Sequence, residues 1–493
     1  MTETETETGD ELKDRRRKVP IRTKLLFASG TLQEATVTAG GITTMLFYNQ
    51  VLGVSPALVG MAFLIVSILD AVADPIVGLW SDRFHSRWGR RHPFMFFSAF
   101  PIAIGFYFLY QPVNGLSETG LVIWLVVFFT MVRLGQTFYL IPHDALGAEL
   151  TDDYEDRTSV FGYNNVAEMI LSTLVVSILY YVIFGTVEEG TNSLVNEAGY
   201  VVMAWTGSVT IFFSVLLCTL STLDQLPYMQ KVEDAQNFST RDFLAEISLL
   251  LSNPSFLAAC LSLLIIMIGL GIIGVVANYA YIYVYELSTE QMFWAGVAKM
   301  PGVFVALPLL YFLSKNFEKR EIVIATTLAV SFLVPLPHFL MLIDFFPASD
   351  SPYYLFAIFG PLLLAYLVFP VSYIVIDSQL ADIADQHELQ TNCRSEGVIF
   401  SVRSFGKKST QGVGGLLAGF GLEFIGFPDN AQEVGVPPEA IDGLLFLNGP
   451  VYLGLYLVGV YFMTWYRIDR KTHAEILERL ETRRGEAATT DAF

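Results

Sequence analysis

Long apolar stretches recur along the whole chain and alternate with short polar segments. A membrane-spanning helix needs about 20 predominantly apolar residues. Twelve stretches of this kind cover approximately residues 25–50, 55–80, 93–112, 119–146, 159–186, 198–221, 256–285, 290–314, 321–344, 353–381, 396–426 and 443–467. The pattern therefore predicts an all-α integral membrane protein with twelve transmembrane helices.

Lysine and arginine are unevenly distributed among the polar segments. Successive helices reverse direction, so the segments fall into two alternating sets. One set, together with both chain ends, carries the basic residues, whereas the other six segments contain no Lys or Arg. Because cytoplasmic loops of membrane proteins are enriched in Lys and Arg, we expect a multi-pass protein of the plasma membrane with both termini in the cytoplasm.

The chain also looks doubled. A polar segment at 222–254 separates six apolar stretches from six, and the loop WSDRFHSRWGRRHP after the second stretch has a weaker counterpart, LSKNFEKRE, after the eighth. We expect a cytoplasmic N-terminal tail (1–24), a six-helix bundle (25–221), a cytoplasmic linker (222–254), a second bundle (255–467) and a cytoplasmic C-terminal tail (468–493). Two related halves of six helices are typical of secondary transporters.

Composition and motifs exclude several other classes of protein. Hydrophobic residues make up 53% of the chain and charged residues 16%, against about 25% charged residues in soluble proteins. The sequence contains no G-x-x-x-x-G-K-[ST], H-E-x-x-H or G-x-S-x-G motif, so we expect neither an enzyme nor an ATP-driven pump. We likewise expect no cofactor and no nucleic-acid partner.

The formal net charge is −19, and the chain begins with the acidic tail MTETETETGDE. Acidic surfaces remain hydrated when molar salt screens their self-repulsion. A salt-rich cytoplasm of the halophilic kind is one interpretation, and an ordinary acidic tail is the alternative.

Two acidic residues lie one helical turn apart inside the second apolar stretch. Asp70 and Asp74 share a helix face, where two bare carboxylates repel each other unless they share a proton or hold a cation. Oxygen ligands suit a hard ion such as Na⁺. We expect a site for Na⁺ or H⁺ here, and the alternative is that Asp74 braces the adjoining basic loop.

The fourth apolar stretch carries a polar stripe formed by Arg133, Thr137 and Asp144. Arg133 must pair with an acid or face water, so it either contacts substrate or forms a structural ion pair, for which Glu168 is a plausible partner. Asp144 lies close to the cytoplasmic end and fits a gate.

Two further ionisable residues are candidates for substrate binding. Glu34 is the only acid in the first stretch, and it either contacts substrate or pairs with a lysine of the other half. Lys408 continues a polar stripe in the eleventh stretch and is expected to face the substrate. Gating contacts that form in one conformation and break in another are expected from Asp82, Arg83, Arg90, Arg91, Asp144, Arg157 and Arg394.

Three segments resemble motifs of the glycoside–pentoside–hexuronide:cation symporters, a family of the major facilitator superfamily. They are DAVADPIVGLWSDRFHSRWGRR (70–91), IPHDALGAELTDDYEDRTSVFGY (141–163) and LADIADQHELQTNCRSEGVIFSVRSFGKK (380–408). The resemblance implies the major facilitator fold, a central cavity between the halves, and sugar–cation symport by alternating access.

The resemblance also implies roles for individual residues. Asp70, Asp74 and Thr137 match the cation-binding residues of the melibiose carriers, and Glu34 and Lys408 match residues on the sugar side. Departures from the family's pattern fall at Ala73, Leu140, Asp144 and Asn165, mostly on the sugar side.

We therefore expect a small-molecule substrate, a sugar or glycoside, carried by a monomer in a lipid bilayer. The alternatives are an organic-anion or lysolipid-like cargo for the same fold, or an uncoupled facilitator.

Overall fold

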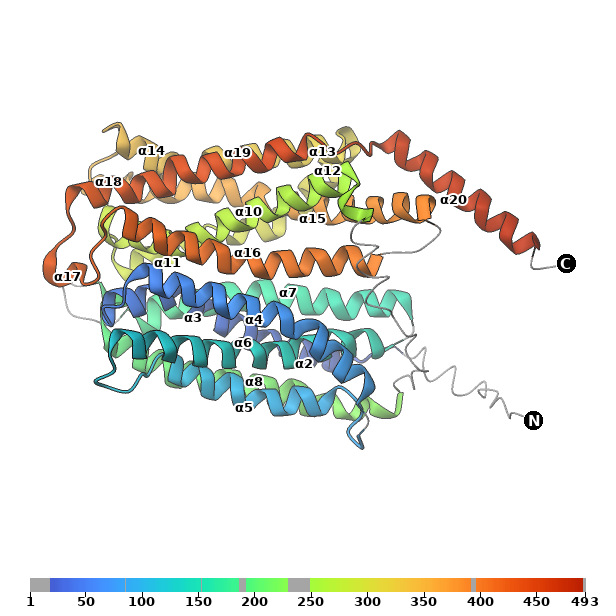
Figure 1. The fold of residues 1–493 in the computed structure, drawn as a ribbon, viewed down its shortest axis with the longest axis horizontal. Coiled ribbons are helices and arrows are strands. Elements are labelled where there is room, and N and C mark those ends of the chain that lie inside the picture. Colours follow the sequence, from blue (N-terminus) through green and yellow to red (C-terminus); the bar gives the residue numbers. More distant parts are fainter. Residues whose placement is uncertain are drawn as a thin grey trace. The chain divides into compact units, whose positions relative to one another are not determined.

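The computed structural model describes residues 18–84, 86–151, 153–185, 192–228, 249–391 and 396–490. Every regular element in these ranges is helical (Figure 1). The chain divides into two compact units. Unit 1 contains the described residues of 1–235 with Ser288–Phe293 and Pro428–Gly435, and unit 2 contains those of 236–287, 294–427 and 436–493.

Unit 1 is a bundle of long helices. Its α-helices are α2 (Ile21–Ala28), α3 (Thr31–Leu46), α4 (Pro56–Arg83), α5 (His92–Leu109), α6 (Glu118–Glu149), α7 (Tyr154–Ile178) and α8 (Glu197–Ser221). Helix α6 packs against α4 and α5, α5 also packs against α8, and α3 packs against α7 and α8. Helix α6 is thus a shared neighbour that can bring its side chains to those of α4.

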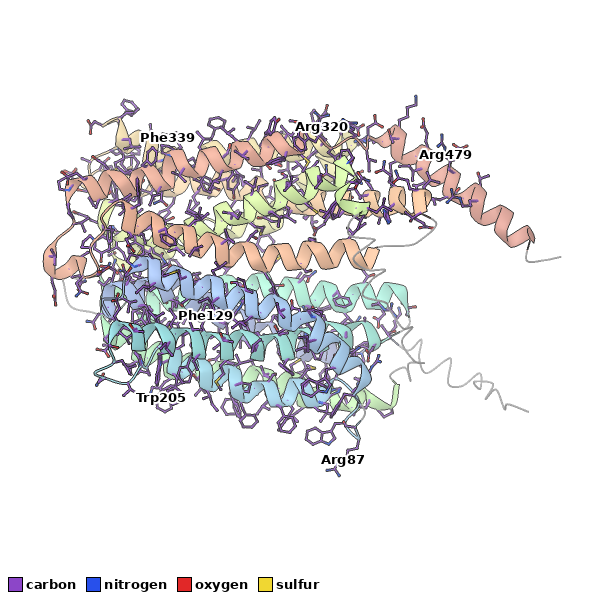
Figure 2. The ribbon with its side chains drawn as sticks, in the orientation of Figure 1. Arg87, Phe129, Trp205, Arg320, Phe339 and Arg479 are labelled. Atoms are coloured by element: carbon purple, nitrogen blue, oxygen red, sulfur yellow. The ribbon has the colours of Figure 1, made fainter. Side chains whose placement is uncertain are left out.

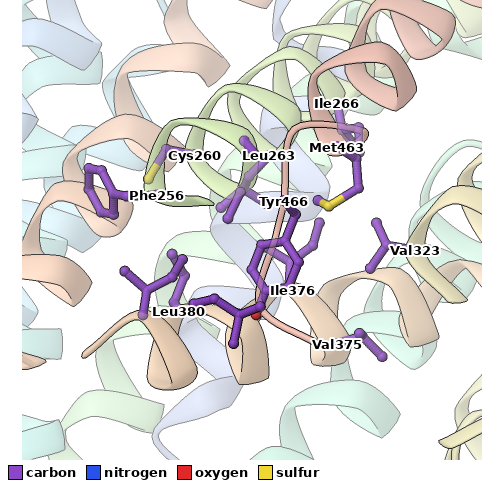
Figure 3. Close-up of a cluster of buried hydrophobic side chains, with 14 of the residues drawn as sticks. Phe256, Cys260, Leu263, Ile266, Val323, Val375, Ile376, Leu380, Met463 and Tyr466 are labelled. Carbon is purple, nitrogen blue, oxygen red and sulfur yellow. The ribbon is translucent and has the colours of Figure 1, made fainter. Parts of the chain in front are cut away.

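Unit 2 is a second bundle of helices. Its α-helices are α10 (Pro254–Tyr279), α11 (Thr289–Val297), α12 (Met300–Asn316), α13 (Lys319–Leu333), α14 (Leu336–Leu342), α15 (Tyr354–Thr391), α16 (Glu396–Phe424), α18 (Pro438–Phe446), α19 (Tyr452–Met463) and α20 (Arg470–Thr490). The first residues of α11 belong to unit 1. Buried side chains of α10, α13, α15 and α19, among them Leu263, Val323, Ile376 and Met463, form its apolar core (Figure 3).

The helices have the length and surface of a membrane protein. Ten helical spans among the described residues are long and apolar enough to cross a bilayer. Large apolar side chains project from their outer faces, such as Trp205, which is 57% exposed (Figure 2). Such side chains are costly in water but favourable in lipid.

The other two predicted spans are helical but differ from a continuous apolar helix. The first is divided into α2 and α3, and the eleventh, α16, is markedly apolar only over Gly412–Phe424. The first span divides at Ser29 and Gly30. An added Cβ at Gly30 would lie 1.9 Å from the Tyr139 hydroxyl oxygen, so this close approach leaves no room for a side chain. Helix α3 begins at Thr31, and Glu34 lies in its first turn.

The segment Pro428–Gly435, which follows α16 in sequence, packs in unit 1 on the π-helical turn Phe47–Val51. The Gln50 amide donates a hydrogen bond to the Pro428 carbonyl (2.8 Å) and accepts one from the Ala431 N–H (3.1 Å). The Asn49 amide donates to Asp429 (3.1 Å). Since Asn49 and Gln50 are buried, these bonds satisfy polar groups that would otherwise be unpaired.

Candidate functional site

The two acids predicted to bind a cation meet a hydroxyl group from α6. The Thr137 Oγ1 lies 2.7 Å from Asp70 Oδ1 and 3.1 Å from Asp74 Oδ1. Asp70 is 2% exposed and Asp74 is half-buried. A threonine hydroxyl has a single proton to donate, so this proton is shared between the two carboxylates, and both accept from Thr137. The structure thus brings together the three residues that were predicted as a cation site.

Arg133 is the fourth member of this cluster. It lies one helical turn before Thr137 on α6, and its Nη2 is 3.0 Å from Asp70 Oδ2. Its side chain is 24% exposed, against 2% for that of Asp70. The sequence analysis proposed an acid as a structural partner and named Glu168, but the ion pair seen here joins Arg133 to Asp70.

A proline inside α4 also affects the backbone between the two acids. Pro75 lies inside α4, and a proline has no N–H to donate to the carbonyl four residues earlier. The Ala71 carbonyl, between Asp70 and Asp74, is therefore without its usual helical donor. Two carboxylates, a hydroxyl and a carbonyl are the oxygen donors that hard cations such as Na⁺ prefer.

Among the described residues there is no group of three or more His, Cys, Asp or Glu side chains that could hold a metal ion.

Glu34 lies next in sequence to Gln33, which contacts α6. Gln33 is fully buried, and its Oε1 is 3.5 Å from the Gln136 Nε2 on α6. Gln136 directly precedes Thr137. Glu34 is half-buried in the first turn of α3, where the helix dipole favours a negative charge. Lys408 is half-buried on α16 in unit 2.

Two arginines of the basic loop between α4 and α5 contact the end of α6. Arg90 Nη2 lies 2.7 Å from Glu149 Oε1, and Arg91 Nε and Nη2 lie 3.2 and 3.1 Å from the same oxygen. Arg91 Nη1 also donates to the Ser81 hydroxyl (2.8 Å). The sequence analysis identified the arginines but missed Glu149. An acid within one turn of a helix end beside a basic loop was the available signal.

The other predicted gating residues have different surroundings. The Asp144 side chain is 70% exposed, and its Oδ1 is 3.6 Å from His143 Nδ1. The Arg157 guanidinium donates to the Thr151 carbonyl at 3.2 and 3.3 Å. The side chains of Asp82 and Arg83, and the whole of Arg394, lie outside the described residues.

Unit 2 contains a similar contact between a loop and a helix. Lys319, which follows the loop after α12, donates to both carboxylate oxygens of Asp382 on α15 (2.6 and 2.7 Å). The Tyr466 hydroxyl donates to the same carboxylate (3.2 Å). Burial and the nearby charge of Asp382 raise the pKa of Tyr466, which keeps the hydroxyl protonated. The weak sequence echo between the loops is thus matched by a shared contact type.

Ionisable side chains buried inside long apolar helices, with oxygen donors gathered around a carboxylate pair, define a class of protein: polytopic membrane transporters. The chain belongs to the MFS/sugar transport protein family, whose profile matches residues 27–470. Proteins of this family are membrane transporters rather than enzymes, and their cargo is a small molecule.

Known relatives agree with this membership. The isoprimeverose transporter of Lactiplantibacillus pentosus is 24% identical over 442 residues, covering 88% of this chain and 86% of that protein. The sodium-dependent lysophosphatidylcholine symporter 1 of Gallus gallus is 22% identical over 502 residues, covering 96% and 92%. A D-xylose-proton symporter structure shares the fold, with a TM-score of 0.60 at 15% identity, covering 92% of this chain and 98% of that one.

Proposed function

We propose that this transporter is a symporter that couples the movement of a sugar or glycoside to that of a monovalent cation, Na⁺ or H⁺, by alternating access. The observation that carries the proposal is the Thr137 hydroxyl, 2.7 Å from Asp70 and 3.1 Å from Asp74. It joins α4 to α6 through a carboxylate pair whose repulsion a bound cation would relieve. Cation binding thereby favours one packing of the two helices.

Coupling requires that cation and substrate favour the same conformation. Glu34, close in sequence to the Gln33–Gln136 contact with α6, is positioned to respond to that packing. We propose that Glu34 and Lys408 bind substrate hydroxyl groups. We further propose a monomer in the plasma membrane with both termini in the cytoplasm, adapted to a saline cell interior by its net charge of −19.

The test is substrate accumulation in vesicles with an imposed Na⁺ gradient and then a pH gradient. Asp70→Asn and Asp74→Asn are expected to abolish uphill accumulation while downhill exchange survives. Asp344→Asn is the matched control, because Asp344 is exposed and its φ of 56° suits Asn equally well. If accumulation persists in both site variants, or does not depend on the Na⁺ gradient or the pH gradient, the protein is an uncoupled facilitator and the proposal is wrong.

A lysolipid-like cargo is the second candidate, favoured by the lysophosphatidylcholine in the name of the Gallus gallus relative. Counterflow separates the two, with sugars, organic acids or lysophosphatidylcholine as the unlabelled competitor. Competition by lysophosphatidylcholine alone would replace the sugar proposal.

A further inference from the structure

The guanidinium group of Arg133 lies against one of the two paired carboxylates, that of Asp70. Both oxygens of Asp70 face α6: Oδ1 accepts the Thr137 hydroxyl at 2.7 Å, and Oδ2 lies 3.0 Å from Arg133 Nη2. Asp70 is one of the most deeply buried acids of unit 1. A positive charge at this distance from a poorly hydrated carboxylate is strongly attracted to it.

We infer that Arg133 is a built-in cation that competes with the coupling ion for Asp70 and thereby sets the affinity and selectivity of the cation site. The inference rests on the proposed function of the same site. Arg133 places a positive charge beside one of the two carboxylates. The site therefore attracts a monovalent ion less strongly than the same carboxylates would without Arg133.

Arg133 is more exposed than Asp70, so its guanidinium group can move away from the carboxylate. Its side chain is 24% exposed while that of Asp70 is 2% exposed, so the guanidinium has access to space outside the cluster. An arginine side chain is long and rotatable, but Asp70 is short and fixed on α4. An ion entering between Asp70 and Asp74 therefore displaces the guanidinium and leaves the carboxylates in place.

Arg133 and Thr137 also lie one turn apart on the same face of α6, so both follow any movement of that helix. When α6 moves toward α4, the hydroxyl and the guanidinium approach Asp70 together. The same movement that completes the oxygen ligands therefore strengthens the competing charge. Arg133 accordingly favours weak, readily reversible ion binding, which suits an ion that must be released in every transport cycle.

The experiment measures Na⁺ binding to the purified full-length protein in detergent. NaCl is titrated at fixed pH and constant ionic strength, with choline chloride as the replacement salt. Na⁺ binding is followed by the heat of binding or by the change in the unfolding temperature. Arg133→Gln removes a positive charge that lies 3.0 Å from a buried carboxylate, and it is expected to lower the half-saturating Na⁺ concentration about ten- to hundredfold. Arg133→Lys keeps the charge and is expected to stay within about threefold of wild type, by the same reasoning.

Arg403→Gln is the matched control. Arg403 pairs with Asp377 at 2.6 Å, and its side chain is 23% exposed, almost the same as that of Arg133. The same substitution therefore breaks a similar ion pair, one that belongs to unit 2 and does not include Asp70. Its half-saturating Na⁺ concentration is expected to equal that of wild type.

An unchanged or weaker Na⁺ affinity in Arg133→Gln would overturn the inference, as would an equal gain in Arg403→Gln. If Arg133→Gln is too unstable to purify, adding Asp70→Asn is expected to restore folding by removing the ion pair as a whole. The inference would also be overturned if the double variant, Arg133→Gln with Asp70→Asn, were no more stable than Arg133→Gln alone. The proposed function fails separately, when the Asp70→Asn and Asp74→Asn variants still accumulate substrate against its gradient.

Discussion

Replacing Glu149 by Gln tests whether the contact between the basic loop and α6 stabilises the described conformation. The change keeps the shape of the side chain and removes the charge that Arg90 and Arg91 share. Three guanidinium nitrogens lie within 3.2 Å of Glu149 Oε1, and a Gln oxygen can still accept from one or two of them. The main loss is therefore the charge opposite the buried Arg91.

The burial of the partners sets the size of the effect. Removing one partner of a fully buried ion pair costs about 3–5 kcal/mol. The side chains here are 21% (Arg90), 7% (Arg91) and 13% (Glu149) exposed, so solvent screens part of the interaction. We expect Glu149→Gln to lower the free energy of unfolding by about 2 kcal/mol, which corresponds to a roughly 30-fold change in an equilibrium constant.

The assay is reversible unfolding of the purified protein, followed by tryptophan fluorescence, with a double-mutant cycle that adds Arg91→Gln. The exposed Glu197, in the first turn of α8, supplies the control variant Glu197→Gln, which is expected to change stability by less than about 0.5 kcal/mol. A coupling energy of at least about 1 kcal/mol is expected between positions 91 and 149. Additive effects, or a Glu149→Gln protein as stable as wild type, would refute the reasoning.

Three further predictions concern packing, salt and pH. Gly30→Ala is expected to destabilise unit 1, because the new methyl group would overlap the Tyr139 hydroxyl oxygen at 1.9 Å; Tyr139→Phe in the same chain should recover part of the loss in thermal unfolding. If the net charge of −19 reflects a saline cell interior, stability and transport should rise between about 0.1 and 3 M KCl, and full activity at the lower limit would contradict this. Hydrogen bonds from the Thr472 backbone N–H and side chain lower the pKa of Asp469, which lies at the start of α20. A lowered pKa means that this capping is present at neutral pH and is lost as the pH falls through that pKa. The protection of the amides in the first turn of α20, measured relative to the intrinsic exchange rate at each pH, should therefore fall on acidification, and Asp469→Ala should remove the dependence.

The helical spans could be predicted because their physical cause is local. A bilayer demands about 20 apolar residues in succession and internal hydrogen bonds for the backbone, and both are properties of a short stretch of sequence. The same holds for Asp70 and Asp74, since a spacing of four residues places side chains on one face of any α-helix. These features were therefore visible without knowing which helices are neighbours.

The exceptions arose where a distant residue decides the local structure. The requirement for a glycine at position 30, between α2 and α3, comes from Tyr139, more than a hundred residues away, whose hydroxyl excludes a side chain there. Similarly, the sequence offers acids near the end of α6, but the structure was needed to show that Glu149, rather than Asp144, receives Arg90 and Arg91. Which of two acids faces an arginine depends on how α6 is rotated against its neighbours.

By itself, the sequence determined that this protein is a helical membrane transporter with a carboxylate pair in its second span, because hydrophobic length and helical spacing act within one element. The tertiary structure alone decided what that pair meets: Thr137 as a bridge between the two carboxylates, and Arg133 as the counter-charge of Asp70. The physical reason is that a buried charge takes its partner from whichever helix packs beside it, and the packing of α4 on α6 is a property of the whole bundle.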